Sequence, residues 1–188
     1  MISSKSDYAA YIQADQIALK ADTIKPLLNT DNSMIWLTDH VFKWEKLLRK
    51  IEYWENCHHS VLAAPYRFFL RFRFQRLSAF LGFSIPLNVI GPGLSILHYG
   101  SIVISRHARI GRNCTLNSGV NIGANPIRGG APIIGDDVYI GPGAKLWNDI
   151  VIADGVIIGA NACVSKSVLT PKSTVILSNS VIKPSSGK

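Results

Sequence analysis

The second half of the chain repeats every six residues, and this repeat constrains the fold more than any other feature. From residue 104 onward, aliphatic residues stand six apart in one register that breaks once. They are Ile104, Ile110, Leu116, Ile122, Ile134, Ile140, Leu146, Ile152, Ile158 and Val164. The fourth residue after each one is again of a type that proteins bury, from Ala108 to Val168. The pattern predicts short β-strands, each ended by a bend, whose aliphatic side chains stack inside a coil.

Residues that tolerate a left-handed backbone stand between these two positions. The third residues after the aliphatics are His107, Asn113, Gly119, Asn125, Asp137, Gly143, Asp149, Gly155, Asn161 and Ser167. Gly, Asn and Asp adopt positive φ more readily than other residues do, so we expect a tight bend at every sixth residue. The register skips one hexad between Ile122 and Ile134, where the Pro and Gly spacing of residues 124–132 predicts an extruded loop. Loops on a rigid scaffold are common sites of ligand contact.

The first half of the chain has a different composition. Residues 1–90 hold one of the fifteen glycines, Gly82, and most of the aromatic residues. Apolar residues at helical spacing predict helices over 6–22, with Ser6 or Asp7 as the cap, and over 34–56, with a cap at 31–33. A third helix is predicted from Pro65 to Gly82. We therefore divide the chain into a helical region (1–89), a coil (90–170) and a tail (171–188), and the helices could cover one end of the coil.

Two motifs in the helical region have competing interpretations. Residues 67–76 interleave arginine with phenylalanine, which fits a nucleic-acid patch or an amphipathic helix packed on a neighbour. We favour the helix, since no nucleic-acid motif accompanies it. The run from Cys57 to His59 has metal-ligand residue types, but adjacent histidines on a helix point in different directions and no spaced partner exists, so we predict no metal site.

Composition narrows the class of protein. The chain is 47% hydrophobic and 17% charged, which is typical of a globular protein, and no apolar run has the length of a membrane span. The three cysteines are widely spaced and predict no disulfide framework. Residues 1–15 contain no apolar signal core, so we expect a cytoplasmic protein. The net charge is +8, of which the coil half contributes +5.

The hexad with its extruded Gly-rich loop resembles the hexapeptide-repeat acyltransferases. The order of helices and coil looks like the serine acetyltransferases, especially short relatives associated with bacterial capsule and O-antigen synthesis. This resemblance implies an α+β fold, in which helices precede a left-handed parallel β-helix. It also implies acetyl-CoA as co-substrate, no metal, and a homotrimer whose active sites lie between adjacent coils.

The resemblance assigns roles to individual residues. Residues 96–102 match the motif that carries the family's catalytic histidine, so His98 is the candidate general base, while His107 occupies a bend and is structural. If Ile96 and Ile102 both face inward, the repeat must slip by two residues before Ile104. Backbone N–H groups of the extruded loop are the oxyanion-donor candidates: Gly129, Gly130 and Ala131. The candidates for binding CoA are Ala144, Lys145, Gly159, Ala160, Lys166 and Lys172, although lysines on a solvated face would explain the three cations equally well.

The sequence departs from the serine acetyltransferase pattern beside the base. The family has an aspartate directly before its catalytic histidine, whereas Leu97 stands there in this chain, and no carboxylate occurs between Glu55 and Asp136. Binding the ammonium group of serine is therefore hard to explain, and we favour a saccharide hydroxyl as the acceptor. Its candidate contacts are Tyr99, Asn117, Arg128 and Trp147.

Several alternatives remain open from the sequence. One is O-acetylation of L-serine, and another is a non-catalytic trimeric scaffold. A hexapeptide-fold carbonic anhydrase is set aside, because the coil holds only two histidines. Groups that could reach the site from another chain are Ser84, Asn88, Asp15 and Asp39.

Overall fold

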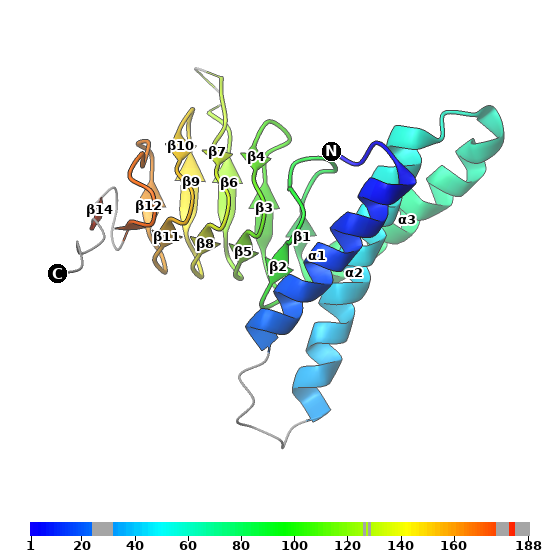
Figure 1. Ribbon diagram of the computed structural model, residues 1–188, viewed down its shortest axis with the longest axis horizontal. Helices are drawn as coiled ribbons and strands as arrows, with labels where there is room; N and C mark the ends of the chain where they lie inside the picture. The colour runs from blue at the N-terminus through cyan, green and yellow to red at the C-terminus, as the bar shows by residue number, and fades with distance from the viewer. Residues whose placement is uncertain (24–31, 126, 128, 176–180, 183–188) are drawn as a thin grey trace.

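A bundle of helices stands at one end of a long parallel coil (Figure 1). The structure is a computed structural model that describes residues 1–23, 32–125, 127, 129–175 and 181–182. No helix among these residues is both long and apolar enough to cross a membrane. They also contain no cluster of three or more residues able to hold a metal ion.

The helices lie close to where the sequence predicts them. They are α1 (Lys5–Thr23), α2 (Asn32–Cys57), the short 3₁₀ helix η1 (Val61–Ala63) and α3 (Ala64–Leu81). Pro65 lies in the first turn of α3 and Gly82 ends it with φ of 78°, as expected. The cap of α1 differs from the prediction, because the Ser4 hydroxyl accepts the N–H of Asp7 at 3.1 Å. The predicted cap of α2 includes Asp31, which lies outside the described residues.

The coil consists of three parallel sheets that run along its length. Sheet A contains β1 (Phe83–Ser84), β3 (Ile102–Ile104), β6 (Asn121–Gly123), β9 (Lys145–Trp147) and β12 (Cys163–Val164). Sheet B contains β4 (Arg109–Ile110), β7 (Ile133–Ile134) and β10 (Val151–Ile152). Sheet C contains β2 (Ser95–Ile96), β5 (Thr115–Leu116), β8 (Tyr139–Ile140), β11 (Ile157–Ile158), β13 (Thr174–Val175) and the antiparallel β14 (Val181–Ile182). The chain passes through the sheets in the order C, A, B, so each full coil takes three hexads.

The aliphatic positions of the repeat form the core of the coil. Each of the ten is at most 5% exposed, as the repeat predicts. The predicted two-residue slip lies within β3, where Ile102 pairs with Phe83 of β1 and Ile104 pairs with Ile122 of β6. Both isoleucines face inward and Val103 between them faces out. The sheets also extend beyond residues 90–170, since β1 precedes this range and β13 follows it.

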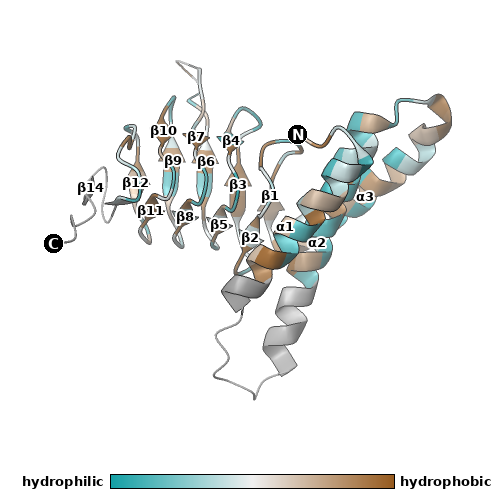
Figure 2. Ribbon diagram, viewed as in Figure 1, coloured by the Kyte–Doolittle hydropathy of each residue, from teal (hydrophilic) through white to brown (hydrophobic). Residues whose placement is uncertain are grey.

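The helical end is joined to the coil by a buried ion-pair network. The Arg49 side chain is fully buried and donates to Asp15 at 2.8 Å and to Glu52 at 3.1 Å. It also donates to the backbone carbonyls of Ile90 at 2.9 Å and Gly91 at 2.7 Å. Arg49 therefore ties α1 and α2 to the turn that leads into β2. Figure 2 shows mixed polar and apolar colouring along these helices, which fits a helical layer that covers the end of the core.

Candidate active site

His98 lies at the corner where the chain turns from sheet C to sheet A. We call this the C–A corner, and it comprises residues 97–101 and, in later coils, 117–120, 141–144 and 159–162. The Leu97 N–H donates to the carbonyl of Leu116 at 3.1 Å, and the Gly100 N–H donates to the carbonyl of Leu81 at 2.9 Å. The backbone is thus fixed on both sides of His98. The imidazole is exposed and makes no hydrogen bond with any described residue.

The next coil supplies polar groups to the same corner. Lys145 is exposed and donates from Nζ to the carbonyl of Gly119 at 2.6 Å. Asn117, an acceptor-binding candidate, is instead 3% exposed, and its Nδ2 donates to the carbonyl of Ile140 at 3.0 Å. Its side chain therefore links two coils rather than facing solvent. Tyr99 beside the base is 49% exposed and remains available to a ligand.

The outer face of sheet A forms a row of side chains beside this corner. Strand register aligns Ser84 with Val103, Val103 with Asn121, Asn121 with Lys145, and Lys145 with Cys163. Alternation along a strand turns these side chains away from the core. Val103 and Asn121 were not predicted as site residues, because the resemblance assigns no role to either position.

The extruded loop leaves the coil at the opposite edge of sheet A, where the chain turns to sheet B. Within one chain, the structure therefore does not bring the loop and His98 to the same corner. The Gly129 N–H donates to the carbonyl of Asn125 at 3.1 Å and is occupied. The N–H groups of Gly130 and Ala131 make no hydrogen bond within the described residues. Arg128 lies outside those residues.

Two side chains flank the base of the loop. Trp147 pairs with Gly123 at the end of β9 and is 44% exposed. Gly130 packs closely on Asp149, since a Cβ on Gly130 would lie 2.5 Å from the Asp149 Cβ. Asp149 thus places a carboxylate beside the loop, which the sequence analysis counted only as a bend residue.

The candidate CoA contacts are distributed over all three corners of the coil. Ala144 lies at the C–A corner with its side chain fully buried, and its N–H closes a turn with the carbonyl of Gly141. Gly159 and Ala160 lie at the same corner one coil later, and Ala160 is exposed. The two other lysines lie elsewhere, with Lys166 at the A–B corner and Lys172 at the B–C corner. Lys145 is therefore the candidate cation that shares the corner of His98.

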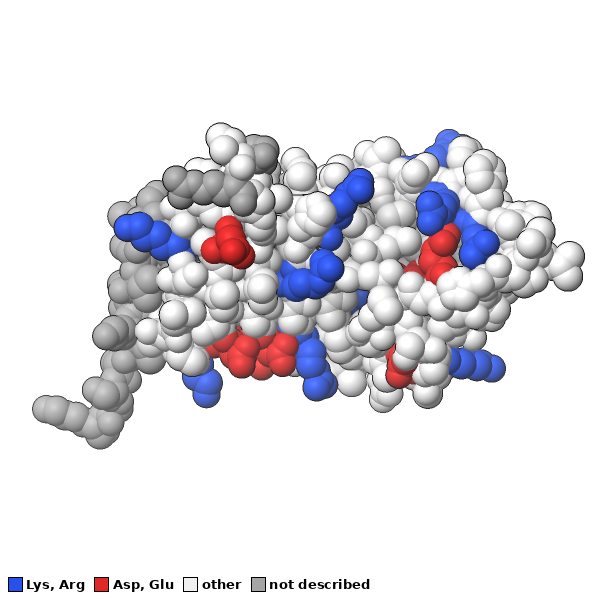
Figure 3. Space-filling view, turned by 90° about the horizontal axis from the view of Figure 1, so that it is seen from above, with Lys and Arg blue, Asp and Glu red and all other residues white. Residues whose placement is uncertain are grey.

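The groups considered as partners for His98 can be traced in part, and Asp15 and Asn88 have other contacts within the chain. Asp15 is 1% exposed and accepts the N–H groups of Gly93 and Leu94 at 2.8 and 2.9 Å. Asn88 pairs with the side chain of Asn56, and the side chain of Asp39 is outside the description. In the coil, Asp136 and Asp154 stack at the B–C corner. Figure 3 shows acidic side chains grouped over the coil on that face.

Comparison with known proteins agrees with this architecture. Residues 131–166 match the family model described as bacterial transferase hexapeptide (six repeats). The matched residues all lie within the coil, so this part of the chain is similar to the hexapeptide-repeat transferases. A serine acetyltransferase of Mycobacterium tuberculosis is 40% identical over 94 residues, which are 49% of this chain and 40% of that protein. One from Staphylococcus xylosus is 38% identical over 107 residues, which are 55% of this chain and 50% of that protein.

Solved structures resemble the whole hexapeptide-repeat chain, helices included. The soybean serine acetyltransferase apoenzyme superposes with a TM-score of 0.72 at 25% identity, covering 96% of this chain and 71% of that one. Serine acetyltransferase of Neisseria gonorrhoeae in complex with serine gives 0.70 at 24% identity, covering 93% and 68%. The expected fold, helices followed by a left-handed parallel β-helix, is confirmed. The chain spans about half the length of the curated relatives it matches.

Proposed function

We propose that the chain is an acetyl-CoA-dependent O-acetyltransferase with His98 as its general base. The observation that carries the proposal is the exposed imidazole on a corner whose backbone is fixed on both sides by Leu97 and Gly100. A base held in this way keeps its position while its side chain remains open to a hydroxyl group. The similarity of the coil to hexapeptide-repeat transferases and the names of its relatives support acetyl transfer.

The chemistry requires a single displacement at the thioester carbonyl. The acceptor oxygen attacks the carbonyl carbon while the His98 imidazole takes the hydroxyl proton. Backbone N–H groups stabilise the oxyanion of the tetrahedral intermediate. Those of Gly130 and Ala131, which make no hydrogen bond within the described residues, are suited to this role. The intermediate then collapses with cleavage of the C–S bond, and the departing CoA sulfur receives the proton from the imidazolium. No covalent enzyme intermediate forms.

We propose a homotrimer, because one chain holds His98 and the loop at opposite edges of sheet A. A second coil beside the first would bring its loop to the His98 corner and complete the site. Apolar side chains on the outer faces of the coil support such packing. Ile133 and Val151 are paired on the outer face of sheet B and are 49% and 41% exposed, and Ile157 on the outer face of sheet C is 45% exposed. Adjacent exposed apolar side chains of this kind are typical of a surface that another subunit covers.

L-serine is the acceptor that the comparisons favour, since the relatives and solved structures reported above are named serine acetyltransferases. A saccharide hydroxyl is the second candidate, and the chemistry of the C–A corner favours it. No carboxylate lies at that corner among the described residues, and Leu97 directly precedes the base. A corner without a carboxylate, with the exposed ring of Tyr99, suits neutral hydrogen bonds and the apolar face of a sugar better than an ammonium group.

An acceptor screen tests the proposal. Release of the CoA thiol is followed at fixed acetyl-CoA with L-serine, nucleotide sugars and acid-treated capsular polysaccharide. Saturable release with any hydroxyl acceptor supports acetyl transfer, and the acceptor that saturates identifies the class. Saturation by sugars with serine inert would exclude serine, and the reverse result would exclude the saccharide. Binding of acetyl-CoA without thiol release for any acceptor would support the non-catalytic scaffold instead.

A further inference from the structure

The outward face of α3 combines exposed aromatic rings with arginines. The inward face of this helix buries Leu70, Phe74, Ser78 and Leu81 against the rest of the protein. On the other side, Phe68, Phe69, Phe72 and Phe80 are 73%, 49%, 51% and 69% exposed. We call these four phenylalanines, together with Arg73 and Arg76, the α3 outer face. An exposed group of this size exceeds the isolated apolar side chains that ordinary surfaces carry.

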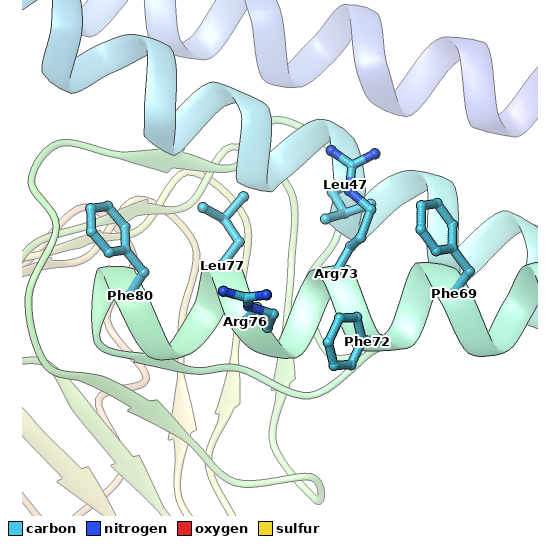
Figure 4. Close-up of a pocket in the computed structure, with 7 residues that line it drawn as sticks. All are labelled: Leu47, Phe69, Phe72, Arg73, Arg76, Leu77 and Phe80. Atoms are coloured by element: carbon cyan, nitrogen blue, oxygen red, sulfur yellow. The ribbon is translucent and has the colours of Figure 1, made fainter.

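The arginines of this face lie among the rings rather than in ion pairs. The Arg73 guanidinium lies 5.7 Å from the Phe69 ring centroid, and that of Arg76 lies 5.7 Å from the Phe72 centroid. Neither arginine has a carboxylate partner among the described residues, whereas Arg71 nearby is paired with Glu55 at 2.7 Å. Figure 4 shows Phe69, Phe72, Arg73, Arg76 and Phe80 along successive turns of α3, with Leu47 of α2 beside them. A groove of about 420 Å³ runs between them.

The tip before α3 extends this apolar surface. Val61 and Leu62 in η1 are 85% and 93% exposed, and Figure 2 shows the hydrophobic colour of the tip at the far end from the coil. On the neighbouring helix α2, Lys46 is exposed and Lys50 lies 5.5 Å from the Tyr66 ring. Further positive charge therefore borders the same side of the molecule.

We propose that the α3 outer face and the η1 tip bind an anionic phospholipid bilayer, with α3 lying in the plane of the membrane interface. Interleaved aromatic and basic side chains are typical of helices that lie at the headgroup level. The sequence of α3 contains four arginines and no acidic residue, so its charge complements anionic lipid. A second copy packed on the same face would oppose arginine to arginine, which disfavours self-association. This inference does not rest on the acetyltransferase proposal.

Vesicle co-sedimentation of the full chain tests this inference without acetyl-CoA or acceptor. One set of vesicles is pure phosphatidylcholine, and the other contains three parts of phosphatidylglycerol to seven of phosphatidylcholine. We expect binding to the anionic vesicles that weakens as salt is added, and little binding to the neutral ones. Arg73→Ala and Arg76→Ala should each lower the affinity roughly fivefold. Phe72→Ala and Phe80→Ala should each lower it on the order of tenfold.

Matched variants separate membrane contact from general effects. Leu169→Ala removes a side chain that is 70% exposed on the coil, against 69% for Phe80, and Arg106→Ala removes an exposed coil cation. Both should bind like the unmodified chain, and circular dichroism checks that each variant folds. Wild-type protein that stays in the supernatant with anionic vesicles at low salt would overturn the inference. Self-association of the protein that Phe72→Ala abolishes would also overturn the inference. Binding of polyglutamate to this face without binding of vesicles would overturn it too, because it would indicate an acidic protein partner.

Discussion

The Nε atom of Arg49 lies 2.8 Å from Oδ2 of Asp15, and both side chains are buried where the helices meet the coil. The other carboxylate oxygen of Asp15 accepts the N–H groups of Gly93 and Leu94. Residues 90–94 are thus held from both helices directly before β2 and the His98 corner. The pair joins the helical region to the part of the coil that carries the candidate base.

Removal of Arg49 should destabilise the fold strongly. Arg49→Ala leaves Asp15 and Glu52 buried without their cation, and breaking a buried pair in this way costs about 3–5 kcal/mol. Arg71→Ala is the matched control, because the Arg71 side chain is 58% exposed and its pair with Glu55 should contribute less than about 1 kcal/mol. Urea unfolding of both variants measures the difference. Equal losses would mean that the buried network does not stabilise the junction.

Glu45 should make stability depend on pH. Burial, with repulsion from Asp15 next, raises the pKa of its carboxyl well above the ordinary 4.5. Neither carboxyl oxygen has a hydrogen-bond partner among the described residues, and the nearby Ile96 N–H does not meet hydrogen-bond geometry. Folded Glu45 therefore keeps its proton where the unfolded chain has lost it. Its contribution to stability is complete below pH 4.5 and is lost as the pH rises through the folded pKa.

Glu45→Gln removes this titration. Glutamine stays neutral at every pH. The unfolding free energy of the variant, relative to that of the wild type, should therefore increase as the pH rises above 4.5. Denaturant unfolding at a series of pH values measures the gain. A difference between the two proteins that stays constant with pH would contradict a protonated Glu45 in the folded state.

Close stacking of coils should make Gly141 intolerant of a side chain. A Cβ at Gly141 would lie 2.8 Å from the backbone N of Ala160 and 2.9 Å from the Ile158 carbonyl oxygen, so the next coil would have to move. We expect Gly141→Ala to cost about 1–3 kcal/mol. At Gly123 the nearest atom is 3.4 Å away, and neither glycine has a positive φ, so Gly123→Ala should be near neutral. Thermal unfolding of the two variants compares them, and equal melting temperatures would argue against tight stacking at Gly141.

The three cysteines should differ in reactivity. Burial inside the coil raises the pKa of the Cys114 thiol to about 12, whereas Cys57 and Cys163 are partly exposed. The thiolate is the reactive form, so iodoacetamide at pH 8 should modify Cys57 and Cys163 while Cys114 remains unmodified until the chain unfolds. Peptide mass mapping measures the modification. Rapid labelling of Cys114 in the folded protein would show that the coil interior opens.

The coil was predictable because its signal is local. Each inward aliphatic side chain contacts the next coil at a fixed spacing, so the six-residue repeat predicts which side chains stack in the core. Bends with positive φ occur as predicted at six of the ten positions, namely Asn113, Gly119, Asp137, Gly143, Gly155 and Asn161. The prediction is wrong at His107, Asn125 and Ser167, whose φ is not positive. In the hexad of Asp149, however, the positive φ is at Asn148, directly after the three-residue strand β9. Strand length, which the repeat alone does not determine, moves the bend by one residue.

The junction and the site were harder to predict. Asp15 reaches Arg49 across 34 residues and Gly93 across 78, so no sequence period links them. Asn117 was assigned to acceptor binding from its residue type, but its side chain faces the core and bonds to the next coil. The position of His98 at an exposed corner followed from the slip before Ile104, which the spacing of three isoleucines indicated.

His98 is the group on which the proposed function depends most directly. The decisive measurement is the rate of CoA thiol release with a saturating acceptor for the wild type, His98→Ala and His107→Ala. His107 is likewise exposed but lies at the A–B corner of the coil, so it controls for removal of an imidazole. We predict that His98→Ala lowers turnover by about 10²–10⁴-fold while His107→Ala retains it. Unchanged turnover in His98→Ala would contradict the account.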